Sequence, residues 1–126
     1  MQAINFLEYA QKVEAILHTL IITGEALMLS FQIDQRSSLR GCIEGVLQVA
    51  DGSELHFREF VDVSNSAPRL MYAYHYQDSD KALIFRYDNA AHRPRLSRPE
   101  HKHTLSGVEV SLSPTLSQVI EEILRR

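Results

Sequence analysis

The sequence predicts an α+β fold in which a mostly antiparallel β-meander of five to six strands carries one helix at each end of the chain. Apolar residues recur every three or four positions near both ends, which is typical of amphipathic helices. Between these ends they recur every second position, which is typical of half-buried strands. The strand-like segments are joined by polar turns rather than by helices, so we expect antiparallel pairing, with both helices packed on one face of the sheet.

Length and composition indicate an ordinary globular protein. The chain has 126 residues, which is long enough for a hydrophobic core, and we expect residues 1–126 to form a single domain. The N-terminus lacks the features of a signal peptide, and the longest apolar run, residues 18–29, is interrupted and too short to cross a bilayer. We therefore expect a cytoplasmic protein with no membrane partner. Cys42 is the only cysteine, which excludes an intramolecular disulfide.

The N-terminal segment is predicted to be a helix over residues 3–22, followed by a strand over residues 27–33. Gly24 is a natural C-terminal cap for the helix. The apolar helix face comprises Phe6, Leu7, Ala10, Val13, Leu17, Leu20 and Ile21. The apolar positions that alternate in the strand are Leu27, Leu29, Phe31 and Ile33.

A first hairpin is predicted from strands at 43–50 and 54–63, because the Asp51–Gly52 pair between them is a strong turn signal. Side chains alternate between the two faces of a strand, so the turn must bring apolar positions together. Leu47 shares a face with Leu55 only if the loop contains an odd number of residues. We therefore expect a three-residue loop with a bulge.

A second hairpin is predicted from strands at 69–78 and 82–88. An even loop places aromatic and apolar side chains of both strands on one face, where they form the core. These core positions are Tyr72, Tyr74, Tyr76, Leu83, Phe85 and Tyr87. The positions expected on the opposite face are His75, Gln77, Arg86 and Asp88.

The C-terminal part of the chain is predicted as a long loop, a short strand and a helix. The loop covers residues 89–106, and loops of this length in a compact domain are usually functional or disordered. The strand is expected at 107–112. Ser113 is expected to cap the final helix, 114–124, with proline in its first turn.

Histidine, arginine and aspartate are concentrated in three places, at 74–78, 85–89 and 92–103. The chain contains none of the common nucleotide-binding, serine-hydrolase or zinc-protease motifs. Because the second hairpin leads directly into the long loop, side chains from these three places can converge at its end.

The first interpretation of this cluster is cleavage of RNA without a metal. Attack by a 2′-hydroxyl needs a base, an acid and a fixed positive charge, which histidine and arginine supply. One of His75 or His92 would pair with one of His101 or His103. The candidate catalytic residues are His75, Arg86, Asp88, His92, His101 and His103. The candidate substrate-binding residues are Arg93, Arg95, Arg98 and Lys102, which supply positive charge for phosphates.

Two other interpretations remain open. In one, His101 and His103 bind a divalent metal together with Asp88 or His92, because their spacing places both imidazoles on one side of an extended chain. The sequence favours no cofactor, since a third ligand is not identified. In the other interpretation, the chain is a noncatalytic interaction or regulatory module whose basic loop binds an acidic partner.

Several segments carry a resemblance to a known family. They are REF at 58–60, YHYQD at 74–78, LIFRYDNA at 83–90, HKH at 101–103 and the helix at 114–123. Together they resemble the TumE-type toxin family of prokaryotic toxin–antitoxin systems. The resemblance implies a small cytoplasmic protein that inhibits growth and is commonly encoded beside a cognate antitoxin.

The resemblance has two departures. The family typically has two histidines where this chain has His92 and Arg93, and a further histidine where this chain has Glu100. These changes remove potential metal ligands but leave an acid or base candidate on each side of the loop. The favoured interpretation is a toxin that acts on RNA as an endoribonuclease. The N-terminal helix, outside the recognised segments, is a candidate for antitoxin binding or homodimerisation.

Overall fold

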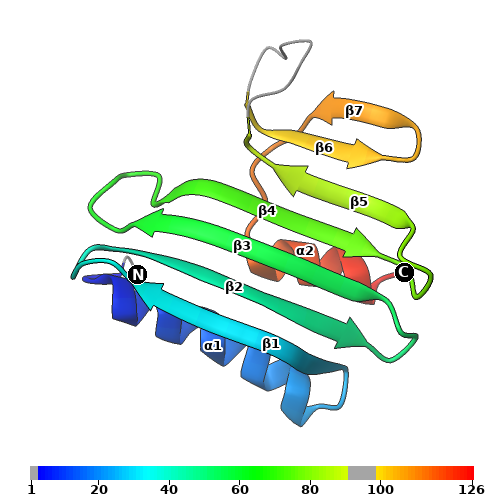
Figure 1. The fold of residues 1–126 in the computed structure, drawn as a ribbon, viewed down its shortest axis with the longest axis horizontal. Helices are drawn as coiled ribbons and strands as arrows, with labels where there is room; N and C mark the ends of the chain where they lie inside the picture. Colours follow the sequence, from blue (N-terminus) through cyan, green and yellow to red (C-terminus); the bar gives the residue numbers. More distant parts are fainter. Residues whose placement is uncertain (1–2, 91–98) are drawn as a thin grey trace.

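The structure, a computed structural model, describes residues 3–90 and 99–126. It confirms the α+β class, with two helices and an antiparallel sheet whose strand order follows the chain (Figure 1). The elements are α1 (Phe6–Ile22), β1 (Ala26–Gln35), β2 (Arg40–Val49), β3 (Glu54–Asp62), β4 (Arg69–Gln77), β5 (Leu83–Asp88), β6 (His101–Thr104), β7 (Gly107–Val110) and α2 (Leu116–Leu124).

The sheet has seven strands rather than five or six, because one strand lies inside the segment predicted as a loop. This strand, β6, pairs with β5 on one side and with β7 on the other. Its sequence, His-Lys-His-Thr, has no apolar alternation, so hydrophobic periodicity could not reveal it. The histidines of this strand therefore have fixed positions in a sheet.

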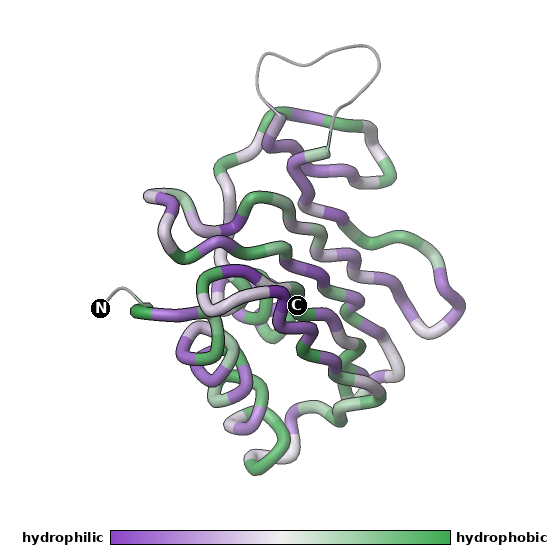
Figure 2. The backbone as a smooth tube through the Cα atoms, turned by 60° about the vertical axis from the view of Figure 1, so that its left-hand side comes forward, coloured by the Kyte–Doolittle hydropathy of each residue, from purple (hydrophilic) through white to green (hydrophobic). Residues whose placement is uncertain are grey.

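Both helices pack against the same face of the sheet, as predicted (Figure 1). Figure 2 shows the same two layers from a second direction. Apolar residues of both helices join the inward side chains of the strands in one hydrophobic cluster. In the described part of the chain, no helix covers the opposite side of the sheet, which we call the helix-free face.

Helix α1 begins where Asn5 accepts a hydrogen bond from the Glu8 backbone N–H at 2.8 Å. It ends before Gly24, whose positive φ of 76° confirms its predicted role as a C-terminal cap. Leu7 and Ile21, predicted on the buried face, are exposed at its margins. The residues that α1 buries are Phe6, Ala10, Val13, Leu17 and Leu20.

A close contact joins the first turn of α1 to β2. The Phe6 ring lies directly over Gly41, where an added Cβ would come within 2.3 Å of a ring carbon. The Phe6 backbone N–H also donates to the Ser38 carbonyl at 2.8 Å. Only a residue without a side chain therefore allows the helix to sit this close to the sheet.

Strand β1 does not present one continuous apolar face, contrary to the alternation predicted from its sequence. The register with β2 shifts between Met28 and Ser30, which is a β-bulge. The bulge reverses which positions face the helices. Leu27 and Leu29 are consequently exposed, whereas Phe31 packs against the hydrophobic cluster.

The first hairpin has the predicted odd loop. Leu47 pairs with Leu55, and the backbone N–H of Val49 donates to the Ser53 carbonyl at 2.9 Å. Three residues, 50–52, therefore form the loop. Gly52 has a φ of 88°, a conformation that glycine adopts without strain.

The second hairpin also confirms the predicted faces. Tyr74 pairs with Tyr87 and Tyr76 with Phe85, and all four side chains are buried. The exception is Leu83, which was predicted on the core face. The register shifts beyond Tyr76 and pairs Leu83 with Gln77 of the opposite face, and Ile84 packs against the hydrophobic cluster instead. The opposite face of this hairpin holds the polar side chains discussed below.

The last helix begins later than predicted. Thr115, not Ser113, is the N-cap, and it forms a capping box with Gln118. Strand β7 likewise ends at Val110 rather than at residue 112. Among residues 3–90 and 99–126, no helix combines the length and apolar character needed to cross a membrane.

Candidate functional site

The register of the sheet places four basic side chains in one row across the helix-free face. His56 pairs with His75, His75 pairs with Arg86, and Arg86 pairs with His103. Because paired residues point to the same face, strands β3 to β6 each contribute one member of this row. We call it the basic row. Asp88 and His101 are paired in the adjacent row.

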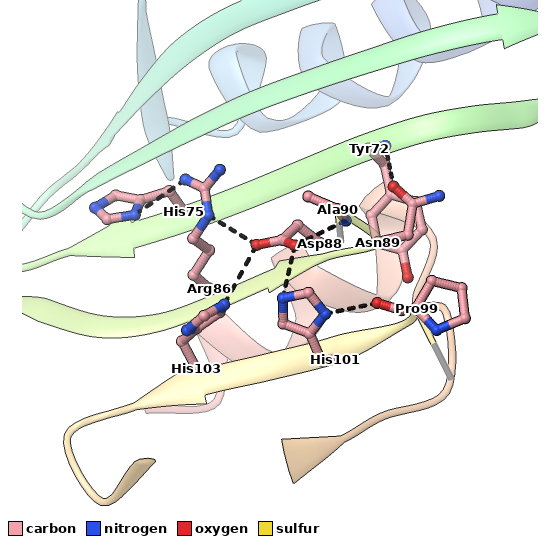
Figure 3. Close-up of polar contacts among 9 residues, drawn as sticks. All are labelled: Tyr72, His75, Arg86, Asp88, Asn89, Ala90, Pro99, His101 and His103. Carbon is pink, nitrogen blue, oxygen red and sulfur yellow. Dashed lines mark hydrogen bonds and ion pairs between the residues drawn. The ribbon is translucent and has the colours of Figure 1, made fainter. Parts of the chain in front are cut away.

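Asp88 is the centre of the polar contacts (Figure 3). Its carboxylate accepts a hydrogen bond from Arg86 Nε at 2.9 Å and lies 2.8 Å from His101 Nε2. The Ala90 backbone N–H donates to the same carboxylate at 3.1 Å, and His103 Nε2 lies 3.6 Å from it. Asp88 is only 4% exposed, so these groups replace the water that its charge would otherwise require.

His101 is held between two acceptors. Its Nδ1 lies 2.6 Å from the Pro99 carbonyl oxygen, and its Nε2 faces the Asp88 carboxylate (Figure 3). These two contacts fix the orientation of the imidazole ring. The side chain is 2% exposed. This geometry favours a positioning role for His101 rather than proton exchange with a substrate.

His75, unlike His101, is suited to accept a proton from a substrate. It is half-buried, and burial lowers its pKa from 6.5, assisted by the nearby positive charge of Arg86 and by His56. Its Nε2 lies 3.2 Å from Gln77 Oε1, and its Nδ1 lies 3.5 Å from Arg86 Nη1 (Figure 3). The amide oxygen accepts, so Nε2 is the protonated nitrogen and Nδ1 has the lone pair. His75 is therefore set up as a neutral base at pH 7.

His103 lies on the other side of Arg86 in the basic row. Its side chain is 26% exposed, far more than that of His101. Its Nε2 faces the Asp88 carboxylate at 3.6 Å. The row thus places a neutral imidazole and a carboxylate-supported imidazole on opposite sides of one guanidinium.

Comparison with known protein families shows which family the chain belongs to. A family model described as Toxin TumE matches residues 17–126. The chain belongs to the TumE toxin family. The match includes every strand and α2, whereas the first part of α1 lies outside it. No curated protein and no solved structure is similar enough to match the chain.

The structure of this member of the TumE toxin family does not bring Lys102 to the site, although the sequence suggested that Lys102 binds substrate. Strand alternation turns Lys102 to the helix side, where its Nζ lies 3.1 Å from Glu122 and 4.8 Å from the centre of the Tyr87 ring. Lys102 therefore ties β6 to α2. The other predicted positions His92, Arg93, Arg95 and Arg98 lie outside the described residues.

Glu59, which belongs to the family pattern, also lies on the helix side. It is 2% exposed and accepts hydrogen bonds from the hydroxyls of Tyr9 and Tyr74. Tyr74 in turn accepts from Arg69 at 2.9 Å. This network links α1 to β3 and β4 and is separated from the basic row by the sheet itself.

Two site features escaped the sequence analysis. His56 was not among the candidate site residues, although its ring lies edge-on to that of His75 at 6.2 Å between centroids. The register between the two hairpins would have revealed this neighbour. Asn89 fixes the end of β5, because its side chain accepts from the Tyr72 N–H at 3.0 Å and donates to the Leu70 carbonyl at 3.1 Å.

The donor set of Asp88, His101 and His103 also fits a divalent metal ion. One ligand atom from each residue lies within 4.8 Å of the others. The bond between His101 and the Pro99 carbonyl is the kind of outer contact that orients metal-binding imidazoles. A bound ion would share the Asp88 carboxylate with the positive charge of Arg86.

Proposed function

We propose that this TumE toxin is an endoribonuclease that cleaves single phosphodiester bonds by acid–base catalysis without a metal. The observation that carries the proposal is the order of the basic row, in which Arg86 lies between His75 and His103. Neighbouring strands are about 4.8 Å apart, so the backbones of the two histidines are separated by roughly 10 Å. A phosphate bound to the guanidinium would thus have one imidazole on each side.

The proposed reaction is attack of the ribose 2′-oxygen on the adjacent phosphorus. His75 Nδ1 accepts the proton of the 2′-hydroxyl while the new oxygen–phosphorus bond forms. The bond to the 5′-oxygen of the next nucleotide breaks, and His103 donates a proton to that leaving oxygen. The products are a 2′,3′-cyclic phosphate and a free 5′-hydroxyl.

The remaining polar residues support these groups. Arg86 stabilises the additional negative charge on phosphorus in the transition state. Asp88 holds the guanidinium in place and lies 3.6 Å from His103 Nε2. His101 fixes the orientation of Asp88 by bridging it to the Pro99 carbonyl. Arg93, Arg95 and Arg98, which lie between Asp88 and His101 in the sequence, would supply phosphate contacts away from the scissile bond.

A second candidate function is a metal-dependent nuclease, which the donor set of Asp88, His101 and His103 supports. A bound divalent ion would supply Lewis-acid activation of a phosphate oxygen. The charge of Arg86 beside the same carboxylate is the reason that we favour the metal-free reaction. The noncatalytic alternative is that the basic row only binds an acidic partner.

The proposal includes a biological setting. Membership of a toxin family suggests a cognate antitoxin protein as partner, action in the cytoplasm and growth arrest when the toxin is expressed alone. Helix α1 is the element that we expect to bind this antitoxin or a second copy of the chain, since the family match begins only at residue 17.

The test is cleavage of a defined single-stranded RNA by the purified toxin in the presence of EDTA. We expect products that end in 2′,3′-cyclic phosphate, and no cleavage when each ribose is replaced by 2′-deoxyribose. His75→Ala should abolish cleavage, whereas His18→Ala, an exposed position on α1, should leave it unchanged. Equal cleavage of the deoxy strand, or products with a 2′,3′-diol, would exclude the proposed reaction. Activity only after addition of a divalent metal would favour the second candidate.

A further inference from the structure

A groove on the helix-free face begins at the proposed catalytic residues and runs away from them on one side only. It has a volume of about 300 Å³ and starts at His75 and Arg86. From there it extends across β3 and β2 to Ser30 and Gln32 on β1. His103 does not line it. The groove therefore lies on the side of Arg86 where the base, rather than the acid, is placed.

The lining of this groove combines four kinds of surface, one of which is the exposed ion pair of Arg58 and Glu44, whose Nε and Oε2 atoms lie 3.2 Å apart. Its floor includes the small, half-buried side chains of Val46 and Ala73. One wall is the imidazole of His56, which is 45% exposed. The far end offers the hydroxyl of Ser30 and the amide of Gln32, both on exposed residues.

This combination matches the chemistry of a nucleobase. An unpaired base has two flat apolar surfaces and an edge of hydrogen-bond donors and acceptors. Imidazole and small apolar groups contact the flat surfaces, while hydroxyl and amide groups can read the edge. A volume of about 300 Å³ lies at the lower end of the range for small-molecule sites, which suits one nucleotide. In duplex RNA the hydrogen-bonding edge of a base is already paired with another base, so the groove could bind only an unpaired base, and the substrate is single-stranded.

The chemistry of the reaction decides which base the groove would bind. The 2′-hydroxyl that loses its proton belongs to the nucleotide on the 5′ side of the cut. His75 is the group that takes this proton in the proposed reaction, and the groove lies on the same side as His75. We propose that the groove binds the base immediately 5′ of the cut and makes the toxin selective for that base in single-stranded RNA. This inference rests on the proposed endoribonuclease function.

The first experiment maps cleavage sites in a random-sequence single-stranded RNA pool. We expect a roughly tenfold preference for one base at the position 5′ of the cut, since one good base contact or stacking interaction has about this effect. Ser30→Ala combined with Gln32→Ala, and separately His56→Ala, should reduce the preference to below about threefold. Gln11→Ala, on the exposed side of α1, is the control.

The second experiment measures binding of the four nucleoside 3′-monophosphates and 5′-monophosphates by calorimetry and NMR. The 3′-monophosphates should bind with base-dependent affinity and shift the amide signals of His56 and Ala73, and the Ser30/Gln32 variant should remove the base dependence. Cleavage without a base preference, or a preference that survives the variants, would overturn the groove assignment and leave the nuclease function standing. Base-dependent binding without any cleavage would support the groove and reject the nuclease. Absence of both would reject both.

Discussion

His101 Nε2 lies 2.8 Å from Asp88 Oδ1, and both side chains are less than a tenth exposed. The two side chains are thus held in contact where water hardly reaches them. Such a pair contributes little net stability over apolar residues, but removing one partner leaves an uncompensated buried charge. Asp88 is also the residue to which Arg86 is hydrogen-bonded, so the pair connects the stability of the sheet with the geometry of the site.

Asp88→Asn should destabilise the protein by about 3–5 kcal/mol, because it removes the buried carboxylate that Arg86 and His101 both contact. Urea unfolding followed by circular dichroism measures this loss. Asp34→Asn is the matched control, since Asp34 forms an exposed ion pair with Arg36 at 2.9 Å and should cost at most about 1 kcal/mol. Equal effects of both substitutions would show that the buried pair has no special role.

His75 should titrate with a pKa below 6.5, because burial and the charge of Arg86 both disfavour its protonated form. As the pH falls below 6.5, the unfolded state gains this proton first, so the contribution of His75 to stability decreases towards acidic pH. Arg86→Met should raise the pKa of His75 towards 6.5, and Arg36→Met should not change it. NMR titration of the imidazole signals tests this, and an unchanged pKa in Arg86→Met would contradict the assigned cause.

The two histidines of the basic row should control opposite arms of the pH–rate profile. His75→Ala should remove the rise of activity with increasing pH, and His103→Ala should remove the fall at higher pH, since a base and an acid are lost respectively. Arg86→Ala should slow turnover by about 10²-fold or more with partial retention of RNA binding. Initial-rate measurements over pH decide this. If both histidine variants lose the same arm, the acid and base assignments are wrong.

Arg95→Ala and Arg98→Ala should weaken RNA binding with little change in turnover, since phosphate contacts act mainly through release of counterions. Each substitution should reduce the slope of log affinity against log salt by about 0.7 on single-stranded RNA. Fluorescence anisotropy at several salt concentrations measures the slope. Arg36→Ala serves as the control, because Arg36 is an exposed arginine paired with Asp34. A large loss of turnover at unchanged affinity would instead place these arginines in the chemical step.

Metal analysis of toxin purified without an affinity tag should find less than one divalent ion per chain, and EDTA should not reduce activity. The reason is that Arg86 already neutralises the carboxylate that a metal would need. His103→Ala is the informative variant, since it removes one potential ligand and leaves the contact between His101 and Asp88 in place. Stoichiometric zinc or nickel that disappears in this variant would establish the metal site.

Much of the fold could be predicted from the spacing of apolar residues along the sequence. The apolar ladder of the second hairpin and the odd loop between Leu47 and Leu55 were both predictable, because a one-residue slip would expose a whole strand face. The β-bulge in β1 was not, since an inserted residue leaves no sign in a pattern of alternating leucines. Ser113 was a plausible helix cap, but the reciprocal bonds of Thr115 and Gln118 are stronger.

The candidate site was predictable in composition but not in arrangement. The sequence indicated His75, Arg86, Asp88 and the two histidines of β6 as neighbours. It could not distinguish the roles of His101 and His103, because exposure and hydrogen-bond partners depend on how β6 pairs with β5. Lys102 was wrongly predicted to lie at the site for the same reason. In a loop its side chain could point either way, whereas in a strand alternate side chains point to opposite faces.

Gly41 has a consequence for the genetics of this toxin. In a selection for cells that survive its expression, mutations should arise at Gly41 as well as in the basic row, because any side chain there would collide with the Phe6 ring. Survivors with changes at His75 or Arg86 should still accumulate folded toxin, whereas survivors with changes at Gly41 should contain little. An immunoblot of such survivors would therefore separate residues required for killing from residues required for the protein to persist in the cell.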